Sequence, residues 1–62
     1  MTIVLSNDQT AKCWTAKFLN SSTMPNGQWL PLPFGNDASF YVVADDLQRR
    51  FRNCTIHERG AR

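Results

Sequence analysis

Two stretches of the chain alternate between apolar and polar residues, and each predicts a β-strand. Within 10–20, Trp14, Ala16 and Phe18 share one parity, with more polar residues between them. A period of two is typical of a strand with one buried face. The segment 28–34 alternates again, and Asn26-Gly27 before it favours a turn because both residues tolerate positive φ. The two strands are therefore expected to form a hairpin.

Pro31 and Pro33 place the second strand at an edge of the predicted sheet. N–H groups of residues two apart in a strand point to the same lateral side, so the prolines remove donors from one side only. That side is expected to face outward and to block pairing with a further strand. The first residues, 1–9, contain the apolar run Ile3-Val4-Leu5, which fits either a short edge strand or a flexible arm. The sequence leaves this choice open.

A helical stripe of apolar residues predicts one amphipathic helix over 37–53. Its members follow the i, i+3, i+4, i+7 pattern. They are Phe40, Val43, Ala44, Leu47, Phe51 and Cys54. Two acid-first pairs with i, i+4 spacing lie on the solvent side, where they favour ion pairs. These are Asp45–Arg49 and Asp46–Arg50.

The start of this helix has a competing interpretation. Asn36 or Asp37 is the expected N-cap, because a short polar side chain there accepts a hydrogen bond from the first turn. The alternative is a strand over 40–43 followed by a shorter helix from Ala44, since β-branched and aromatic residues favour strand locally. We prefer the long helix because its stripe accounts for nearly all the apolar residues of the segment.

These elements predict a single α+β domain over 1–62 with the order β-β-α-β. The segment 54–58 alternates and is expected to be a last strand, with Cys54 and Ile56 inward, followed by a tail over 59–62. A crossover through the helix makes this strand parallel to the second and antiparallel to the first. The expected sheet has three antiparallel strands in the spatial order 2-1-3. The helix covers one face and leaves the other uncovered.

The composition is typical of a small folded protein, and the positive charge is concentrated near the end of the chain. Of 62 residues, 42% are hydrophobic and 19% charged, with a net charge of +2, which argues against a disordered chain. Residues 47–62 carry five arginines against one glutamate. These cations either stabilise the helix C-terminus or meet an acidic protein face or a phosphate backbone. Without a long apolar run or signal-like N-terminus, we expect a cytoplasmic protein without membrane contact, and cysteines that remain free thiols.

Residues suited to catalysis or metal binding are few. His57 is the one histidine, and no carboxylate is placed by the pattern to orient it as a general base. Cys13, Cys54 and His57 give three ligands where structural zinc needs four, and the last two are expected on opposite strand faces. We therefore expect no enzyme activity, no metal and no cofactor.

Two surfaces are the predicted binding sites. The uncovered sheet face is expected to carry Lys17, Trp29, His57 and Arg59, and the outer helix face Tyr41, Arg49 and Arg52. Exposed aromatic and arginine side chains are typical of protein interfaces. The sequence thus favours a non-enzymatic protein-binding accessory or inhibitor that occludes a partner's surface.

Other occupants of the uncovered sheet face stay open at this point. The N-terminal arm or a second copy of the chain are alternatives to a foreign protein. Nucleic acid, bound by the same face and the basic C-terminal quarter, is the second function considered. The outline of hairpin, helix and final strand resembles small phage- or plasmid-encoded inhibitors of host enzymes. This resemblance is architectural only and assigns no residue a role.

Overall fold

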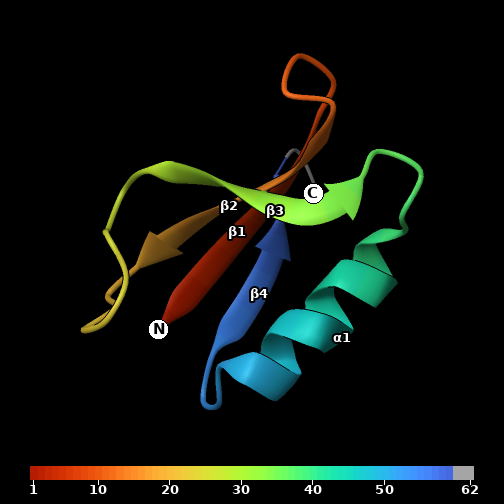
Figure 1. Cartoon of the computed structure of the whole chain (residues 1–62). Helices are drawn as coiled ribbons and strands as arrows, with labels where there is room; N and C mark the ends of the chain where they lie inside the picture. Colours follow the sequence, from red (N-terminus) through yellow and green to blue (C-terminus); the bar gives the residue numbers. More distant parts are fainter. Residues whose placement is uncertain (60–62) are drawn as a thin grey trace.

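The computed structural model describes residues 1–59, which form one helix and a four-stranded sheet (Figure 1). The elements are β1 (Thr2–Asp8), β2 (Cys13–Leu19), β3 (Trp29–Gly35), α1 (Phe40–Arg50) and β4 (Thr55–Glu58). The strand order is β3-β2-β1-β4. Neighbouring strands are antiparallel except β1 and β4, which are parallel. The α+β class with one helix on one sheet face is confirmed, whereas the three-stranded antiparallel sheet is wrong.

The first residues form a central strand, neither an arm nor an edge. β1 pairs with β2 from Thr2 opposite Leu19 to Asp8 opposite Cys13. On its other side β1 pairs with β4 over four residues, beginning with Thr2 opposite Thr55. The predicted order 2-1-3 therefore lacks the strand that lies between β2 and β4. The last strand was predicted to run antiparallel to the strand at 10–20, and this direction is right. β4 is parallel to β1, and β1 is antiparallel to β2.

The β2–β3 hairpin and the edge position of β3 are confirmed. Lys17 lies opposite Trp29, and β2 is the one described strand that pairs with β3. The connection is longer than a tight turn, because residues 20–28 lie between the two strands. The Asn26 side chain accepts a hydrogen bond from the Ser21 N–H at 2.8 Å, while Gly27 adopts a φ of +78°. The predicted asparagine–glycine signal is therefore part of a larger folded loop.

The strand predicted over 10–20 begins later, at Cys13, because the chain before it turns. Asp8 Oδ1 accepts hydrogen bonds from the N–H groups of Thr10 and Ala11 at 2.9 and 3.1 Å. Lys12 then adopts a φ of +57°. The β1–β2 connection thus occupies the residues that were expected to start the strand.

α1 is shorter than the predicted helix over 37–53, and it differs from the prediction at both ends. The N-cap is Ser39, whose Oγ accepts a hydrogen bond from the Val42 N–H at 3.3 Å. Asn36, one of the expected caps, instead donates from Nδ2 to Asn7 Oδ1 at 2.6 Å. At the other end the backbone of Phe51 leaves helical geometry, with φ −121° and ψ 105°. The alternative of a strand over 40–43 is wrong.

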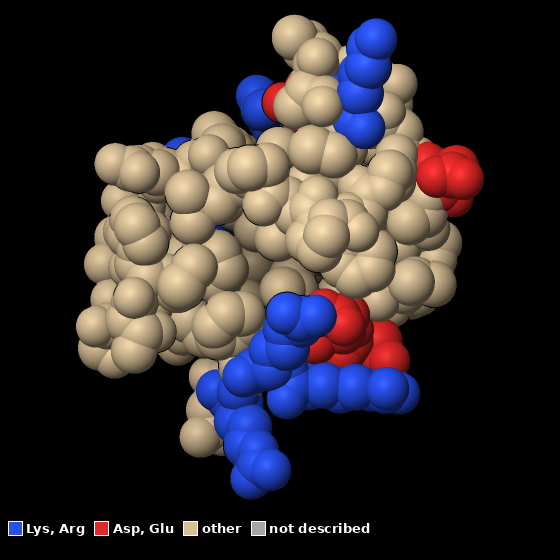
Figure 2. All heavy atoms as spheres, viewed as in Figure 1, with Lys and Arg blue, Asp and Glu red and all other residues tan. Residues whose placement is uncertain are grey.

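Both predicted ion pairs on the outer side of α1 are present. Arg49 and Asp45 approach to 3.0 Å, and Arg50 and Asp46 to 2.8 Å. Figure 2 shows acidic and basic side chains next to one another near the C-terminal end of the helix. The basic end of α1 also suits the negative pole of the helix macrodipole.

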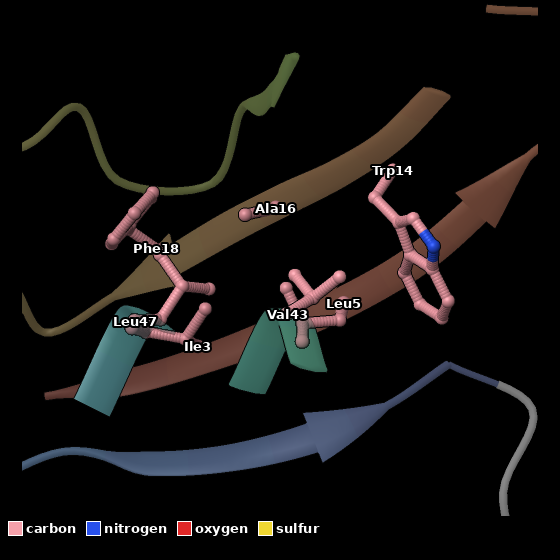
Figure 3. Close-up of a cluster of buried hydrophobic side chains, with 7 residues drawn as sticks. All are labelled: Ile3, Leu5, Trp14, Ala16, Phe18, Val43 and Leu47. Atoms are coloured by element: carbon pink, nitrogen blue, oxygen red, sulfur yellow. The ribbon is translucent and has the colours of Figure 1, made fainter. Parts of the chain in front are cut away.

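The hydrophobic core lies between α1 and the two central strands. Its buried members come from β1, β2 and α1: Ile3, Leu5, Trp14, Ala16, Phe18, Val43 and Leu47. Figure 3 shows Val43 and Leu47 reaching from the helix toward Leu5 and Ile3. In the outer strands the corresponding residues are only partly buried: Leu30, Leu32 and Phe34 of β3 and Ile56 of β4. The helix therefore covers the centre of the sheet more completely than its edges.

Helix and sheet dimensions explain this difference. Four strands about 4.8 Å apart span about 14 Å between the axes of the outer two. One helix with its side chains is about 10–12 Å across, so it cannot cover all four strands equally. Within the described residues, no helix is long and apolar enough to cross a membrane.

Candidate functional site

An apolar groove lies between β3 and α1, where the helix leaves the edge strand half-covered. Its volume is about 390 Å³. β3 contributes Leu30, Pro31, Leu32, Pro33 and Phe34, α1 and its end contribute Asp46, Leu47, Arg50 and Phe51, and Phe18 and Met24 complete the lining. Most of these side chains are hydrophobic. The groove is therefore suited to apolar groups that prefer to leave water.

The register between β2 and β3 changes in the part of β3 that lines this groove. From Thr15 to Cys13 β2 advances by two residues, whereas β3 advances by four between their partners Pro31 and Gly35. Extra residues in one strand bend it and increase its twist. The register change falls within 31–35, so any local bend of β3 is expected beside the groove.

The helix side of the groove carries its charged rim. Asp46 and Arg50 both line the groove and pair with each other at 2.8 Å. Val42 precedes Asp46 by one helical turn and is 55% exposed, so it extends the apolar surface along the same flank of the helix. Figure 2 shows a mainly uncharged surface over β3, bordered by the charged side chains at the end of α1. A ligand in the groove would contact apolar side chains at its base and the ion pair of Asp46 and Arg50 at its rim.

On the opposite side of the sheet, two predicted site residues lie beside the aromatic ring of a third, Trp29. Lys17 Nζ lies 5.5 Å from the centre of the Trp29 ring, and Arg59 Cζ lies 5.4 Å from it. Both distances are within the range of cation–π attraction. The Trp29 side chain thus lies across the open face with cations from β2 and from the chain after β4 beside it.

His57 shares this face through the strand register. Val4 lies opposite Lys17 in β2 and opposite His57 in β4, and Lys17 in turn lies opposite Trp29. One row across the sheet therefore runs His57, Val4, Lys17, Trp29. Arg59 is held one step further along, because its N–H donates to the Leu5 carbonyl oxygen at 2.7 Å. The register therefore places Lys17, Trp29 and His57 on one face, as the sequence predicts, and Arg59 joins them through its approach to the Trp29 ring.

The three residues predicted on the outer helix face are not part of either surface, and the helix position expected for Arg52 is wrong because α1 ends at Arg50. Tyr41 is 81% exposed and its ring meets the edge of Phe40, with centroids 5.7 Å apart. Arg49 is paired with Asp45. Arg52 lines a second, more polar hollow of about 310 Å³ at the end of the helix. These residues remain candidates for separate contacts along the helix.

The two cysteines and the histidine do not converge. Cys13 lies opposite Asp8 at one end of β1, whereas Cys54 directly precedes Thr55, which lies opposite Thr2 at the other end. Cys54 Sγ donates a hydrogen bond to the Phe51 carbonyl oxygen at 3.0 Å. Among residues 1–59, no group of three or more His, Cys, Asp or Glu side chains is arranged to hold a metal ion.

The sequence prediction missed the groove for one reason. The alternation of Leu30, Leu32 and Phe34 correctly predicted their common face, but a three-stranded sheet would have left them under the helix. In the structure β1 is a central strand, and α1 packs mainly on β1 and β2. β3 therefore lies at the edge of the sheet, where the helix covers it only in part. The long-range pairing of β1 with β4 is the signal that the local pattern lacked.

The chain was also compared with known protein families, curated proteins and solved structures. None of these comparisons finds a match. The functional interpretation therefore stands on the geometry of the two surfaces.

Proposed function

We propose that this chain is a small, non-enzymatic protein-binding module, and that its groove between β3 and α1 receives large apolar side chains from a partner protein. The observation that carries the proposal is the apolar lining of this groove, with a volume of about 390 Å³. Buried apolar anchors in such hollows supply much of the free energy of protein association. Binding would occlude the partner's surface, so the activity is that of an accessory or inhibitor protein.

The edge strand determines how a partner docks. An exposed strand edge normally recruits a partner strand through its free N–H groups. Pro31 and Pro33 lack these donors. Recognition at β3 is therefore expected to use side chains entering the groove, and the ion pair of Asp46 and Arg50 at its rim offers polar contacts of both signs.

The test is a pull-down from a nuclease-treated extract of the organism that encodes the chain. Leu32→Glu places a charge in the groove, and Thr23→Glu makes a similar change of charge in the exposed β2–β3 loop. We expect a partner that wild type and Thr23→Glu retain and that Leu32→Glu loses by at least about tenfold, the effect of removing a contact worth about 1.4 kcal/mol. Circular dichroism checks that both variants are folded.

Two outcomes would contradict the proposal. One is that folded Leu32→Glu retains every protein that wild type retains. The other is that sedimentation shows a stable dimer that Leu32→Glu dissociates, because the groove would then be occupied by a second copy. The proposal places binding in the cytoplasm, where Cys13 and Cys54 remain free thiols.

A further inference from the structure

The open sheet face has a charge and ring arrangement that the groove does not use. Trp29 is 38% exposed there, with Lys17 and Arg59 at 5.5 and 5.4 Å from its ring centre. We propose that this face is a second binding site, specific for single-stranded nucleic acid, in which Trp29 stacks on a base while Lys17 and Arg59 contact phosphates.

The first argument is charge complementarity. The register rows of Val4 and Ser6 contain Lys17 and exposed His57 but no carboxylate among the described strand residues. Asp8 is the acidic residue of the same parity, and its Oδ1 is engaged by the N–H groups of the β1–β2 turn. Lys17 and Arg59 thus outnumber the acidic residue of this face, and an excess of positive groups attracts a polyanion and releases its counterions.

The second argument is the association of these cations with an aromatic ring. A single strand presents bases and phosphates in alternation, and non-specific single-strand sites pair stacking rings with cations in the same way. Lys17 of β2 and Arg59, which follows β4, both approach this ring, so two cations from separate parts of the chain are available to phosphates on either side of a base at Trp29. An acidic peptide would satisfy the cations but would leave the ring without its stacking partner.

The shape and charge of the face disfavour the other occupants. The apolar groove that suits a protein anchor lies where β3 meets α1. A second copy docked face to face would bring Lys17 and Arg59 against like charges, which costs free energy in a poorly hydrated interface. Single-stranded nucleic acid supplies the opposite charge and a flat apolar surface together.

Fluorescence anisotropy with a labelled oligothymidylate tests the charge part of the proposal. Between about 50 and 200 mM salt, contact with two phosphates predicts a slope of log affinity against log salt of about −1.4, at about −0.7 each. Lys17→Gln and Arg59→Gln should each remove about half of this slope. Arg52→Gln removes the same charge from the helix end and should leave the slope unchanged.

Tryptophan fluorescence tests the stacking part. The two tryptophans differ in accessibility, because Trp14 is 2% exposed and Trp29 is 38% exposed. Saturating oligothymidylate should quench the Trp29 contribution in wild type and should quench nothing in Trp29→Phe, which retains Trp14. Trp29→Ala should weaken binding by about tenfold, within the range of one base–aromatic stack, and Trp29→Phe should recover most of that loss.

Three results would overturn the proposal. The first is the absence of oligothymidylate binding by the folded wild-type chain at about 50 mM salt. The second is an equal loss of binding in Arg52→Gln and Arg59→Gln, which would indicate non-specific attraction to a basic protein. The third is equal or tighter binding of an oligoglutamate peptide with the same dependence on Trp29, which would assign the face to acidic protein segments. None of these results bears on the groove, whose test uses Leu32.

Discussion

Trp14 Nε1 donates a hydrogen bond of 2.9 Å to the carbonyl oxygen of Ala38. The bond joins β2 to the residue before the N-cap of α1, and the indole ring of Trp14 is itself almost fully buried. It therefore fixes where the helix begins over the sheet. The Phe40 ring packs beside the indole, with centroids 6.4 Å apart.

Replacing Trp14 by Phe should destabilise the protein by about 2 kcal/mol. The substitution removes the donor to Ala38 and leaves a small void, and each effect typically costs about 1 kcal/mol or more. Urea unfolding followed by circular dichroism measures the difference. Trp29→Phe is the matched control, because the Trp29 ring is partly exposed and should change stability by less than about 0.5 kcal/mol. Equal losses in the two variants would contradict a structural role for the indole bond.

Ser39→Ala should lower the free energy of unfolding by about 1 kcal/mol. The Ser39 hydroxyl accepts from the Val42 N–H at 3.3 Å, and loss of an N-cap oxygen leaves that donor unpaired. Thermal unfolding provides the measurement. Ser22→Ala is the control, because Ser22 is exposed in the β2–β3 loop and should have little effect. A larger loss in Asp37→Ala than in Ser39→Ala would restore the cap expected from the sequence.

The sequence predicts those features of the helix that depend on residues close together in the chain. The stripe of Phe40, Val43 and Leu47 identified a helix correctly, because burial of one face follows from residue spacing alone. Its start was placed too early because Asn36 is a good cap by residue type. In the structure Asn36 instead bonds to Asn7, which is 29 positions away in the chain. A contact over that separation has no local sequence signature.

In the sheet and the site, too, local patterns were predicted correctly and long-range contacts were not. Parity correctly grouped Lys17 and Trp29, and the register now places them opposite each other. The run Ile3-Val4-Leu5 did not identify a central strand, because three consecutive apolar residues fit several environments. Its pairing with β2 is that of a hairpin, but its pairing with β4 is nonlocal, and the two together place β1 in the centre of the sheet. The groove was therefore beyond the reach of local patterns.

Replacing Pro31 and Pro33 together by Thr should make the protein self-associate. The double variant restores two backbone donors to a strand that pairs on one side only, and threonine favours extended structure. Sedimentation velocity should show concentration-dependent dimers or larger species where the wild type shows none mediated by β3. A double substitution of exposed loop residues, Ser22→Thr and Gln28→Thr, controls for added threonine. If the variant with threonine at both positions stays strictly monomeric, the prolines do not protect this edge.

Leu5→Ala and Leu30→Ala should differ in cost, although the same atoms are removed. Leu5 in central β1 is 0% exposed, so its truncation should cost about 3 kcal/mol from lost transfer free energy and the cavity left behind. Leu30 in edge β3 is only partly buried and faces the groove. Water already reaches part of its side chain, so its truncation should cost about 1 kcal/mol, since the apolar area lost from the interior is smaller.

Urea unfolding of both variants, with equal slopes required for the comparison, gives this difference directly. Equal costs would mean that α1 covers β3 as fully as β1 in solution, and the groove would then be closed. The predicted inequality links stability to function, because the residues that the helix leaves half-covered are those that line the proposed protein-binding groove. A bound partner should therefore stabilise the protein against unfolding. This stabilisation should be smaller in Leu30→Ala than in wild type at the same partner concentration, because the variant removes part of the contacting wall.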